Sequence, residues 1–474
     1  MARPNRNVAV VFRQVKVCMD GQFFKDKTVL VMGLGRFGGG VDAARFASKV
    51  AARTIVTDMA KAEELGKALA DLNDCPNIIY HLGGHKAEDF ETADILIVNP
   101  AVNPNNQLLK LAAQHGRCVT SQINIFFEMC PAKIVAITGA NGKSTTTALT
   151  AHLLRAGLGQ NSIAYTNVWL GGNIGNEPLL SVIDQIKASD IVVLELSSFQ
   201  LEHLAQTKKA PHVSLITNLT ANHLDRHGTF EAYCGAKETM FSLQTLDTKN
   251  PAVSVFNGED PIATKWFNKY KNDSGRTCYL TKADDISEKF RKVFPLPGKA
   301  NLENLAGAMA IAKHFNVSDE RLLESLPKFK SLPHRLELVA TINDVRYYND
   351  SIATTPQSVM VALDAFSQPK IFIAGGYDKH IPFDELGEQM AQKAKAVVLI
   401  GQTADKIAAA IRAVPKTTTI IEMADSMADA VVAAAKLAEP GDVVLMSPAC
   451  ASYDMFENFQ QRGQIFRDLV HAME

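Results

Sequence analysis

The segment of residues 133–147 constrains the fold more than any other part of the chain. Its apolar residues 134–137 lead into a loop that contains two glycines and then into a lysine followed by a polar, helix-compatible stretch. A buried strand, a glycine-rich loop and a helix in this order typically form a phosphate-binding loop, in which successive backbone N–H groups surround phosphate oxygens. The segment therefore predicts a nucleotide-binding α/β domain. The residues expected to contact the nucleotide are Gly139, Asn141, Gly142, Lys143, Ser144 and Thr145.

The loop departs from the general phosphate-loop pattern at one position. That pattern has a glycine where this chain has Ile137, so the loop is a shortened variant. A helix N-terminus that is merely capped by serine and threonine is the structural alternative. The strand, the loop and the Lys143-Ser144 pair together favour the phosphate loop.

Short apolar runs alternate with amphipathic helical stretches along the chain, which predicts parallel sheets covered by helices. The alternation falls into three blocks that meet near Pro131 and Pro333. We predict an α/β protein of three domains, residues 1–131, 132–332 and 333–474. The first and last are expected to be Rossmann-like, and the central one to be a P-loop domain with a mostly parallel sheet. Strands are expected at residues 28–32, 54–57, 78–80, 95–98, 133–138, 191–196, 213–217, 370–374, 396–400 and 443–446.

The charge balance and the cysteine pattern exclude several classes of protein. The chain has 49 basic and 50 acidic side chains, which does not favour a strongly basic nucleic-acid binder. It contains no apolar run of about 18 residues, so no membrane span is expected. The seven cysteines stand singly, and the first residues lack the apolar core of a secretory signal. We expect a cytoplasmic monomer without a nucleic-acid or membrane partner.

A second glycine-rich turn, residues 33–38, follows the first predicted strand. Its Gly-x-Gly-x-x-Gly spacing, with Asp58 at the end of the next strand, is typical of dinucleotide-binding domains. Any nucleotide diphosphate can use the same turn at a helix N-terminus, and a turn without a ligand can have the same pattern. The residues alone therefore leave open an NAD-dependent oxidoreductase, another nucleotide enzyme and a purely structural turn.

Three side chains of the central block have the chemistry of a metal or phosphate site. Glu195 ends a predicted strand after the apolar residues 191–194, where P-loop proteins have an acid that holds Mg²⁺. His223 lies in a polar loop after another strand and suits either metal ligation or a structural role. Lys237 lies on the following predicted helix and, judged alone, is a solvated surface lysine.

Polar residues in the rest of the chain suggest further contacts. Asn301 and Asn304 lie one helical turn apart, which suits either contact with an adenine edge or helix capping. In the last block, polar residues follow several strands, where open α/β sheets bind their ligands. Arg335 and Lys379 supply positive charge for anionic groups there.

Taken together, the motifs resemble those of the Mur ligases. The resemblance is carried by residues 138–145, 171–175, 194–202, 334–335, 349–351 and 447–452, and is dense from Lys133 to the C-terminus. It implies peptidoglycan precursor synthesis, with consequences for cell shape and division, by an enzyme that binds a UDP-linked substrate, ATP and an amino acid. The motifs are most similar to those of members that add D-glutamate to UDP-N-acetylmuramoyl-L-alanine through an acyl phosphate.

The resemblance also implies roles for individual residues. Catalysis is expected from Lys143, His223 and Lys237. Two Mg²⁺ ions would be held by Ser144, Glu195, His223 and a carbamylated Lys237. ATP would further contact Asn301, Asn304, Arg335 and Asp350. The UDP-linked substrate would contact Gly35, Arg36, Phe37, Thr57, Asp58 and Asn173, and D-glutamate would contact Thr354, Lys379, Ser452 and Phe459.

The chain departs from the family pattern in the stretch that follows Asn349. The family often has a lysine where this chain has Ile352, close to the incoming amino acid. A related Mur ligase or a folylpolyglutamate-type ligase with another amino acid is therefore the first alternative. The NAD-dependent oxidoreductase is the second, and it would use the turn of residues 33–38.

Overall fold

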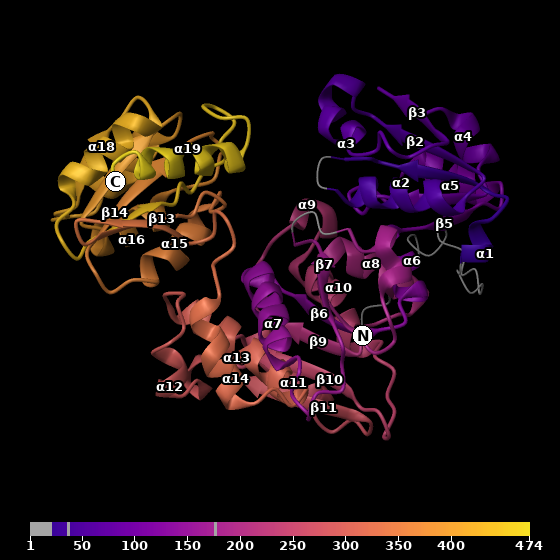
Figure 1. Ribbon diagram of the computed structural model, residues 1–474. Coiled ribbons are helices and arrows are strands. Elements are labelled where there is room, and N and C mark those ends of the chain that lie inside the picture. Colours follow the sequence, from indigo (N-terminus) through magenta and orange to yellow (C-terminus); the bar gives the residue numbers. More distant parts are fainter. Residues whose placement is uncertain (1–20, 36–37, 175–177) are drawn as a thin grey trace. The chain divides into compact units, whose positions relative to one another are not determined.

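The computed structural model describes residues 21–35, 38–174 and 178–474, and these contain three separate sheets (Figure 1). All strand pairs in the first two sheets are parallel, and the third sheet has one antiparallel pair, β12–β13. The predicted α/β fold is confirmed. The chain divides into two compact units, Met1–Lys282 with Leu305–Leu322, and Ala283–Asn304 with Leu323–Glu474.

The first sheet has the strand order β3-β2-β1-β4-β5. Helices α4 and α5 pack on one face, and α2, α3 and α6 contribute to the core on the other. The strands are β1 (Thr28–Met32), β2 (Arg53–Asp58), β3 (Ile78–Leu82), β4 (Ile95–Val98) and β5 (Cys118–Thr120). The helices are α1 (Gly21–Phe24), α2 (Gly39–Val50), η1 (Ala62–Leu65), α3 (Gly66–Ala70), α4 (Ala87–Thr92), α5 (Gln107–Gln114) and α6 (Gln122–Met129).

The second sheet has the order β11-β10-β9-β6-β8-β7, with the strand before the phosphate loop near its middle. The strands are β6 (Lys133–Thr138), β7 (Val168–Gly172), β8 (Ile191–Glu195), β9 (Val213–Ile216), β10 (Ala252–Asn257) and β11 (Arg276–Thr281). The helices of this stretch are α7 (Lys143–Gly157), η2 (Leu180–Gln185), α8 (Ser198–Thr207), α9 (Leu224–His227), α10 (Phe230–Ser242) and α11 (Pro261–Tyr270). Further helices follow along the chain, η3 (Ala283–Asp285), α12 (Glu288–Arg291), α13 (Lys299–His314), α14 (Asp319–Ser325) and η4 (Leu326–Lys328).

The third sheet has the order β12-β13-β17-β14-β15-β16. Helices α15, α16 and α17 pack on one face, and α18 and α19 pack on the other (Figure 1, orange to yellow). The strands are β12 (Glu337–Ile342), β13 (Val345–Asn349), β14 (Lys370–Gly375), β15 (Ala396–Ile400), β16 (Ile420–Met423) and β17 (Val443–Met446). The helices are α15 (Pro356–Asp364), α16 (Asp384–Lys393), α17 (Ala404–Arg412), α18 (Met427–Leu437) and α19 (Phe459–His471).

The strands that the sequence predicts are those with continuous apolar runs. β6, β8 and β15 are buried along nearly their whole length because helices cover both faces of a parallel sheet. The sequence did not predict β10, although all six of its residues are buried. Two other strands that were missed carry weaker signals. β11 is half-buried throughout and β16 is mostly exposed, so neither has a run of apolar residues.

One buried side chain joins the first sheet's α2 to the start of η2. The carboxylate of Asp42, which is 3% exposed, accepts hydrogen bonds from the backbone N–H groups of Leu180 at 3.0 Å and Ser181 at 2.9 Å. Gln122, at the start of α6, donates to the same carboxylate at 2.6 Å, and Lys49 donates to the Ser181 carbonyl at 2.7 Å. These bonds fix η2 against α2, the helix that follows the glycine-rich turn of residues 33–38. Among the described residues, no helix is long and apolar enough to cross a membrane.

Candidate active site at the carboxyl ends of the central strands

The predicted phosphate loop connects β6 to α7 at the carboxyl end of the central sheet. Gly139 has a φ of 151°, and a Cβ atom there would lie 1.9 Å from Thr217 Oγ1. Only glycine fits this position, because both the backbone conformation and the space exclude a side chain. Gly142, at φ 77°, then starts α7, so the free N–H groups of the helix N-terminus are available to an anion.

The loop is held in shape by residues after β9 that the sequence reasoning did not single out. The Asn218 carbonyl accepts from Ala140 N–H at 2.8 Å, and its side-chain oxygen accepts from Asn141 N–H at 2.9 Å. Its amide donates to the Asn141 carbonyl at 3.1 Å, and Thr217 Oγ1 donates to the same carbonyl at 2.6 Å. The position of Asn218 directly after a predicted strand is the signal that could have found it.

Lys143 and Ser144 occupy the first turn of α7. The ammonium of Lys143 donates to the Ala140 carbonyl at 2.8 Å, so the side chain folds over the loop that it is predicted to serve. Ser144 is 5% exposed, which limits its hydroxyl to partners within the site. Both residues therefore lie where the phosphate-loop prediction requires, although no contact with a nucleotide tests that role.

Glu195 ends β8, next to β6, and is 2% exposed. Its Oε1 accepts from the Asn173 amide at 3.2 Å, whereas its Oε2 is buried without a hydrogen-bond partner. A buried carboxylate oxygen without a partner is costly. The carboxylate is therefore suited to bind a cation or a hydrogen-bond donor of a ligand. The structure also brings Asn173, a predicted substrate contact, to the same side chain.

Lys237 is buried rather than solvated, which corrects the interpretation drawn from its sequence position alone. It is 2% exposed, and its ammonium nitrogen lies 3.1 Å from Thr138 Oγ1 and 4.8 Å from the centre of the Tyr233 ring. Burial, and then the charge of Lys143, lower the pKa of Lys237 well below its usual range, and the charge of Glu195 opposes the shift. A lysine in this position favours a neutral, nucleophilic amine. The sequence could not reveal this because α10 has a weak apolar periodicity.

His223 lies just before the short helix α9, with a left-handed φ of 53°. Its ring is 5.1 Å from the ring of Phe199. Burial lowers the pKa of His223, the neighbouring Asp225 raises it, and the charges of Lys143 and Lys237 lower it further. A neutral imidazole is the form that ligates metals.

The donor set fits a hard divalent cation in part. The unpartnered Oε2 of Glu195 and the hydroxyl of Ser144 are oxygen ligands of the kind that Mg²⁺ prefers. Within the described ranges, no group of three or more His, Cys, Asp and Glu side chains is arranged to hold a metal. A cation here would therefore need the serine and the phosphates of a nucleotide as further ligands.

The described part of the second glycine-rich turn, residues 33–35, directly follows β1 in the first sheet. Asp58 accepts from the Gly35 N–H at 3.0 Å, and Thr57 Oγ1 lies 2.8 Å from His85 Nδ1. Asp58 thus lies beside the turn, as the prediction requires. Arg36 and Phe37 fall outside the described residues.

Asp350, which is predicted to hold ATP, lies directly after β13. Its Oδ2 accepts from Ser447 Oγ at 2.7 Å and its Oδ1 from Leu336 N–H at 3.2 Å. Burial raises the pKa of Asp350 to about 7, while these hydrogen bonds and the charge of Arg335 oppose the shift. On α13, Asn304 donates to the Asn301 side chain at 3.3 Å, and Asn301 donates to the Pro297 carbonyl at 2.7 Å. Their roles toward ATP remain predictions.

The residues predicted to hold D-glutamate follow β13, β14 and β17, which are neighbours in the third sheet, or start α19. They are Thr354, Lys379, Ser452 and Phe459. Sequence reasoning missed Arg462, whose guanidinium is 1% exposed and donates to Ser351 Oγ and to the carbonyls of Ser351, Cys450 and Ala451. Arg462 therefore fixes the loops that carry these residues. It stands on a helix beside polar residues, so its sequence position gives no sign of burial.

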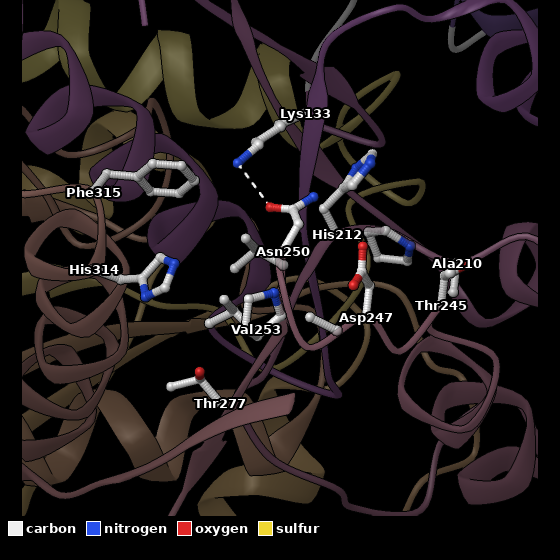
Figure 2. Close-up of a pocket in the computed structure, with 14 residues that line it drawn as sticks. Lys133, Ala210, His212, Thr245, Asp247, Asn250, Val253, Thr277, His314 and Phe315 are labelled. Carbon is white, nitrogen blue, oxygen red and sulfur yellow. Dashed lines mark hydrogen bonds between the residues drawn. The ribbon is translucent and has the colours of Figure 1, made fainter. Parts of the chain in front are cut away.

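A pocket of about 320 Å³ lies at the opposite, amino end of the central strands (Figure 2). Figure 2 shows the Lys133 ammonium directed at the Asn250 carboxamide, 3.3 Å away, with His212 and Asp247 on one side and His314 on the other. Lys133 starts β6, whereas the phosphate loop follows its last residue. The pocket is therefore distinct from the candidate site.

Three protein-family models match successive parts of this chain. The MurD-like N-terminal domain of Mur ligases matches residues 27–121, the Mur ligase middle domain matches 137–312, and the Mur ligase glutamate ligase domain matches 334–450. A protein of Roseiflexus sp. (strain RS-1), named UDP-N-acetylmuramoylalanine–D-glutamate ligase, is 37% identical over 94% of this chain and 98% of its own length. The chain belongs to the Mur ligase family.

Other Mur ligases agree with this assignment. Proteins with the same name from Pelotomaculum thermopropionicum and Clostridium kluyveri are 35% and 37% identical, each over 95% of this chain. The solved structure of the MurF ligase of Thermotoga maritima in complex with ADP is 16% identical, with a TM-score of 0.57 over 96% of this chain and 100% of that chain. A pseudomurein peptide ligase type C of Methanothermus fervidus is 16% identical, with a TM-score of 0.52. The solved structures support the fold, and the relatives favour a ligase over an NAD-dependent oxidoreductase.

Proposed function

We propose that this Mur ligase joins D-glutamate to UDP-N-acetylmuramoyl-L-alanine at the expense of ATP, in peptidoglycan precursor synthesis. The observation that carries the proposal is the buried Glu195 beside the phosphate loop, one oxygen of which has no hydrogen-bond partner. The curated relatives, similar over nearly the whole chain, support the choice of substrates.

The chemistry requires a carboxylate to become a good acyl donor. The carboxylate of the UDP-linked substrate attacks the γ-phosphorus of ATP, the bond to the ADP oxygen breaks, and an acyl phosphate forms. The amine of D-glutamate then attacks the acyl carbon, loses a proton, and phosphate leaves. Phosphoryl transfer of this kind is catalysed mainly by positioning and by positive charge around the transferred group.

The residues around the phosphate loop suit these demands. The loop N–H groups and Lys143 would bind the β- and γ-phosphates, which requires Lys143 to exchange its present bond to the Ala140 carbonyl. Ser144, Glu195 and His223 would hold two Mg²⁺ ions with Lys237, and bound Mg²⁺ would neutralise charge on the phosphates. The buried Glu195 would also orient Asn173 toward the muramoyl part of the substrate.

Lys237 is proposed to be carbamylated. The depressed pKa of Lys237 favours the neutral amine that CO₂ must meet, and the product would carry two oxygens close to Thr138. Carbamylation would replace a buried cation by an anion and thereby offset the positive charge of Lys143 nearby.

The outer substrate sites are proposed on the same basis. The turn at Gly35, with Thr57 and Asp58, would bind the uridine diphosphate, and Arg36 and Phe37 would add to it. Asn301, Asn304, Arg335 and Asp350 would contact ATP. Thr354, Lys379, Ser452 and Phe459 would contact D-glutamate. The division into residues 1–131, 132–332 and 333–474 is supported by the three family matches, which each fall within one domain.

Phosphate release from ATP tests the proposed reaction. The assay contains UDP-N-acetylmuramoyl-L-alanine and compares D-glutamate with L-glutamate, D-aspartate, L-lysine and diaminopimelate. We expect release that requires both the UDP-linked substrate and D-glutamate. Release with a different amino acid would keep the ligase reaction but change the amino-acid specificity. Ile352 would explain that outcome.

A pair of lysine variants tests the site. Lys143→Ala is expected to lower phosphate release at least 100-fold, because the phosphates lose their nearest cation. Lys133→Ala, at the other end of β6, is the matched control and should retain full activity. Equal activity of the two variants would contradict the phosphate-loop assignment.

A further inference from the structure

Three side chains, two of them buried, connect α8 to α9 beside the candidate site. His227 Nε2 lies 2.9 Å from Ser198 Oγ, and His227 Nδ1 lies 3.1 Å from Glu202 Oε1. The side chain of His227 is 1% exposed and Ser198 is 2% exposed. Ser198 and Glu202 lie on α8 and His227 lies on α9, so the contacts among the three side chains hold those helices together.

Both ring nitrogens of His227 face side chains of α8. Nε2 and the Ser198 hydroxyl share a hydrogen bond, and Nδ1 lies within ion-pair distance of the Glu202 carboxylate, whose oxygens can only accept.

This arrangement has the order of a hydrolase triad, yet it cannot act as one. A serine nucleophile must be reached by substrate. Ser198 Oγ is instead buried under the His227 ring, which itself packs on Phe199 at 5.6 Å and on Tyr233 at 5.4 Å. The geometry points to a structural task for the three residues.

Two of the three residues, Ser198 and His227, each lie close in sequence to a proposed metal ligand. Ser198 starts α8 three residues after Glu195, and His227 ends the single turn that begins after His223. The His223 carbonyl accepts from His227 N–H at 3.0 Å. The Phe199 ring, on α8, lies 5.1 Å from the His223 ring and 5.0 Å from the Arg226 guanidinium of α9. The distance between the two ligands thus depends on how α9 sits on α8.

We propose that His227 is a positioning residue that locks α9 onto α8 through Ser198 and Glu202, and so sets where His223 lies relative to Glu195. The proposal rests on the proposed function in that both ligands are assigned to Mg²⁺. Groups that orient ligands without touching the metal commonly affect its affinity by about 10- to 100-fold. None of the three residues would contact ATP or either other substrate.

Metal affinity provides the test, with Mn²⁺ as the probe. Mn²⁺ is titrated into the full-length protein with ADP, the free ion is followed by electron paramagnetic resonance, and a titration of ADP alone is subtracted. His227→Phe keeps a ring against Phe199 and removes both the hydrogen bond to Ser198 and the contact with Glu202. We expect its dissociation constant for Mn²⁺ to rise about tenfold or more, while the KM for the UDP-linked substrate stays within about twofold.

Two further variants separate positioning from general damage. Ser198→Ala removes one hydrogen bond and little volume, and should weaken Mn²⁺ binding in the same direction by a smaller factor, which keeps the test valid if His227→Phe does not fold. The imidazole of His314 pairs with Tyr279 at the far end of the sheet. The control variant His314→Phe should therefore bind Mn²⁺ like the unaltered protein. Unchanged affinity in both His227→Phe and Ser198→Ala would overturn the inference. Failure of the unaltered protein to bind Mn²⁺ would overturn the metal assignment itself, and the inference with it.

Discussion

Replacing Asp42 by alanine should loosen η2 without altering any residue of the candidate active site. The carboxylate is the acceptor for two backbone N–H groups, those of Leu180 and Ser181, in a buried setting. A hydrogen bond to a charged group contributes about 1.5–3 kcal/mol. Since each 1.36 kcal/mol is a factor of ten, the opening equilibrium at each amide should shift by roughly 10- to 150-fold.

Hydrogen–deuterium exchange, followed by mass spectrometry on a peptide that covers residues 179–186, measures this shift. Exchange in Asp42→Ala should be faster by that factor, whereas a peptide that contains β8 should be unchanged. Asp42→Asn retains one acceptor oxygen and should lie between the two. Exchange of the Leu180 and Ser181 amides at the original rate in Asp42→Ala would refute the reasoning, because those amides would then owe their protection to other contacts.

Three further predictions concern residues proposed to bind ATP or Mg²⁺. Asp350 has a pKa of about 7 in the folded chain and about 3.9 when unfolded, so the folded state binds more protons between those values and its stability falls as the pH rises from about 4 to 7. Asp350→Asn should therefore gain melting temperature relative to the unaltered protein as the pH rises through that window; a constant difference in thermal scans would contradict this. Gly139→Ala should cost on the order of 2–4 kcal/mol locally and weaken ATP binding at least tenfold by calorimetry, because its Cβ would overlap Thr217 Oγ1. Lys237→Ala should lose phosphate release, high bicarbonate should not restore it, and rescue by small carboxylic acids would support carbamylation; activity like that of the unaltered protein would dismiss the proposed role.

The sequence predicted those parts of the fold that depend on local pattern. Strands such as β6 and β17 have continuous apolar runs because both faces are covered, and both were located to the residue. The edge strands β11 and β16 are short of buried positions and gave no such signal. The helix predicted to carry Lys237 is α10, and Thr229 caps its start by accepting a hydrogen bond from Ala232 N–H.

The placement of candidate-site residues was predictable where one stretch of sequence carries the pattern and not where distant residues cooperate. Lys143 and Glu195 could be proposed because each follows an apolar run at a known offset, and their roles stay predictions. Lys237 was misjudged from its own sequence because its burial depends on Thr138 and Tyr233, which only the tertiary structure brings to it. Arg462 was missed for the same reason, since its acceptors lie in loops that follow other strands.

The hold of Asn218 on the phosphate loop bears on how fast nucleotide can bind. Three hydrogen bonds join Asn218 to Ala140 and Asn141 in the loop. A loop that such bonds hold in one shape imposes no population penalty on the apparent affinity. Association should therefore follow a single exponential whose rate rises linearly with ATP concentration, without the plateau that a slow loop rearrangement would impose.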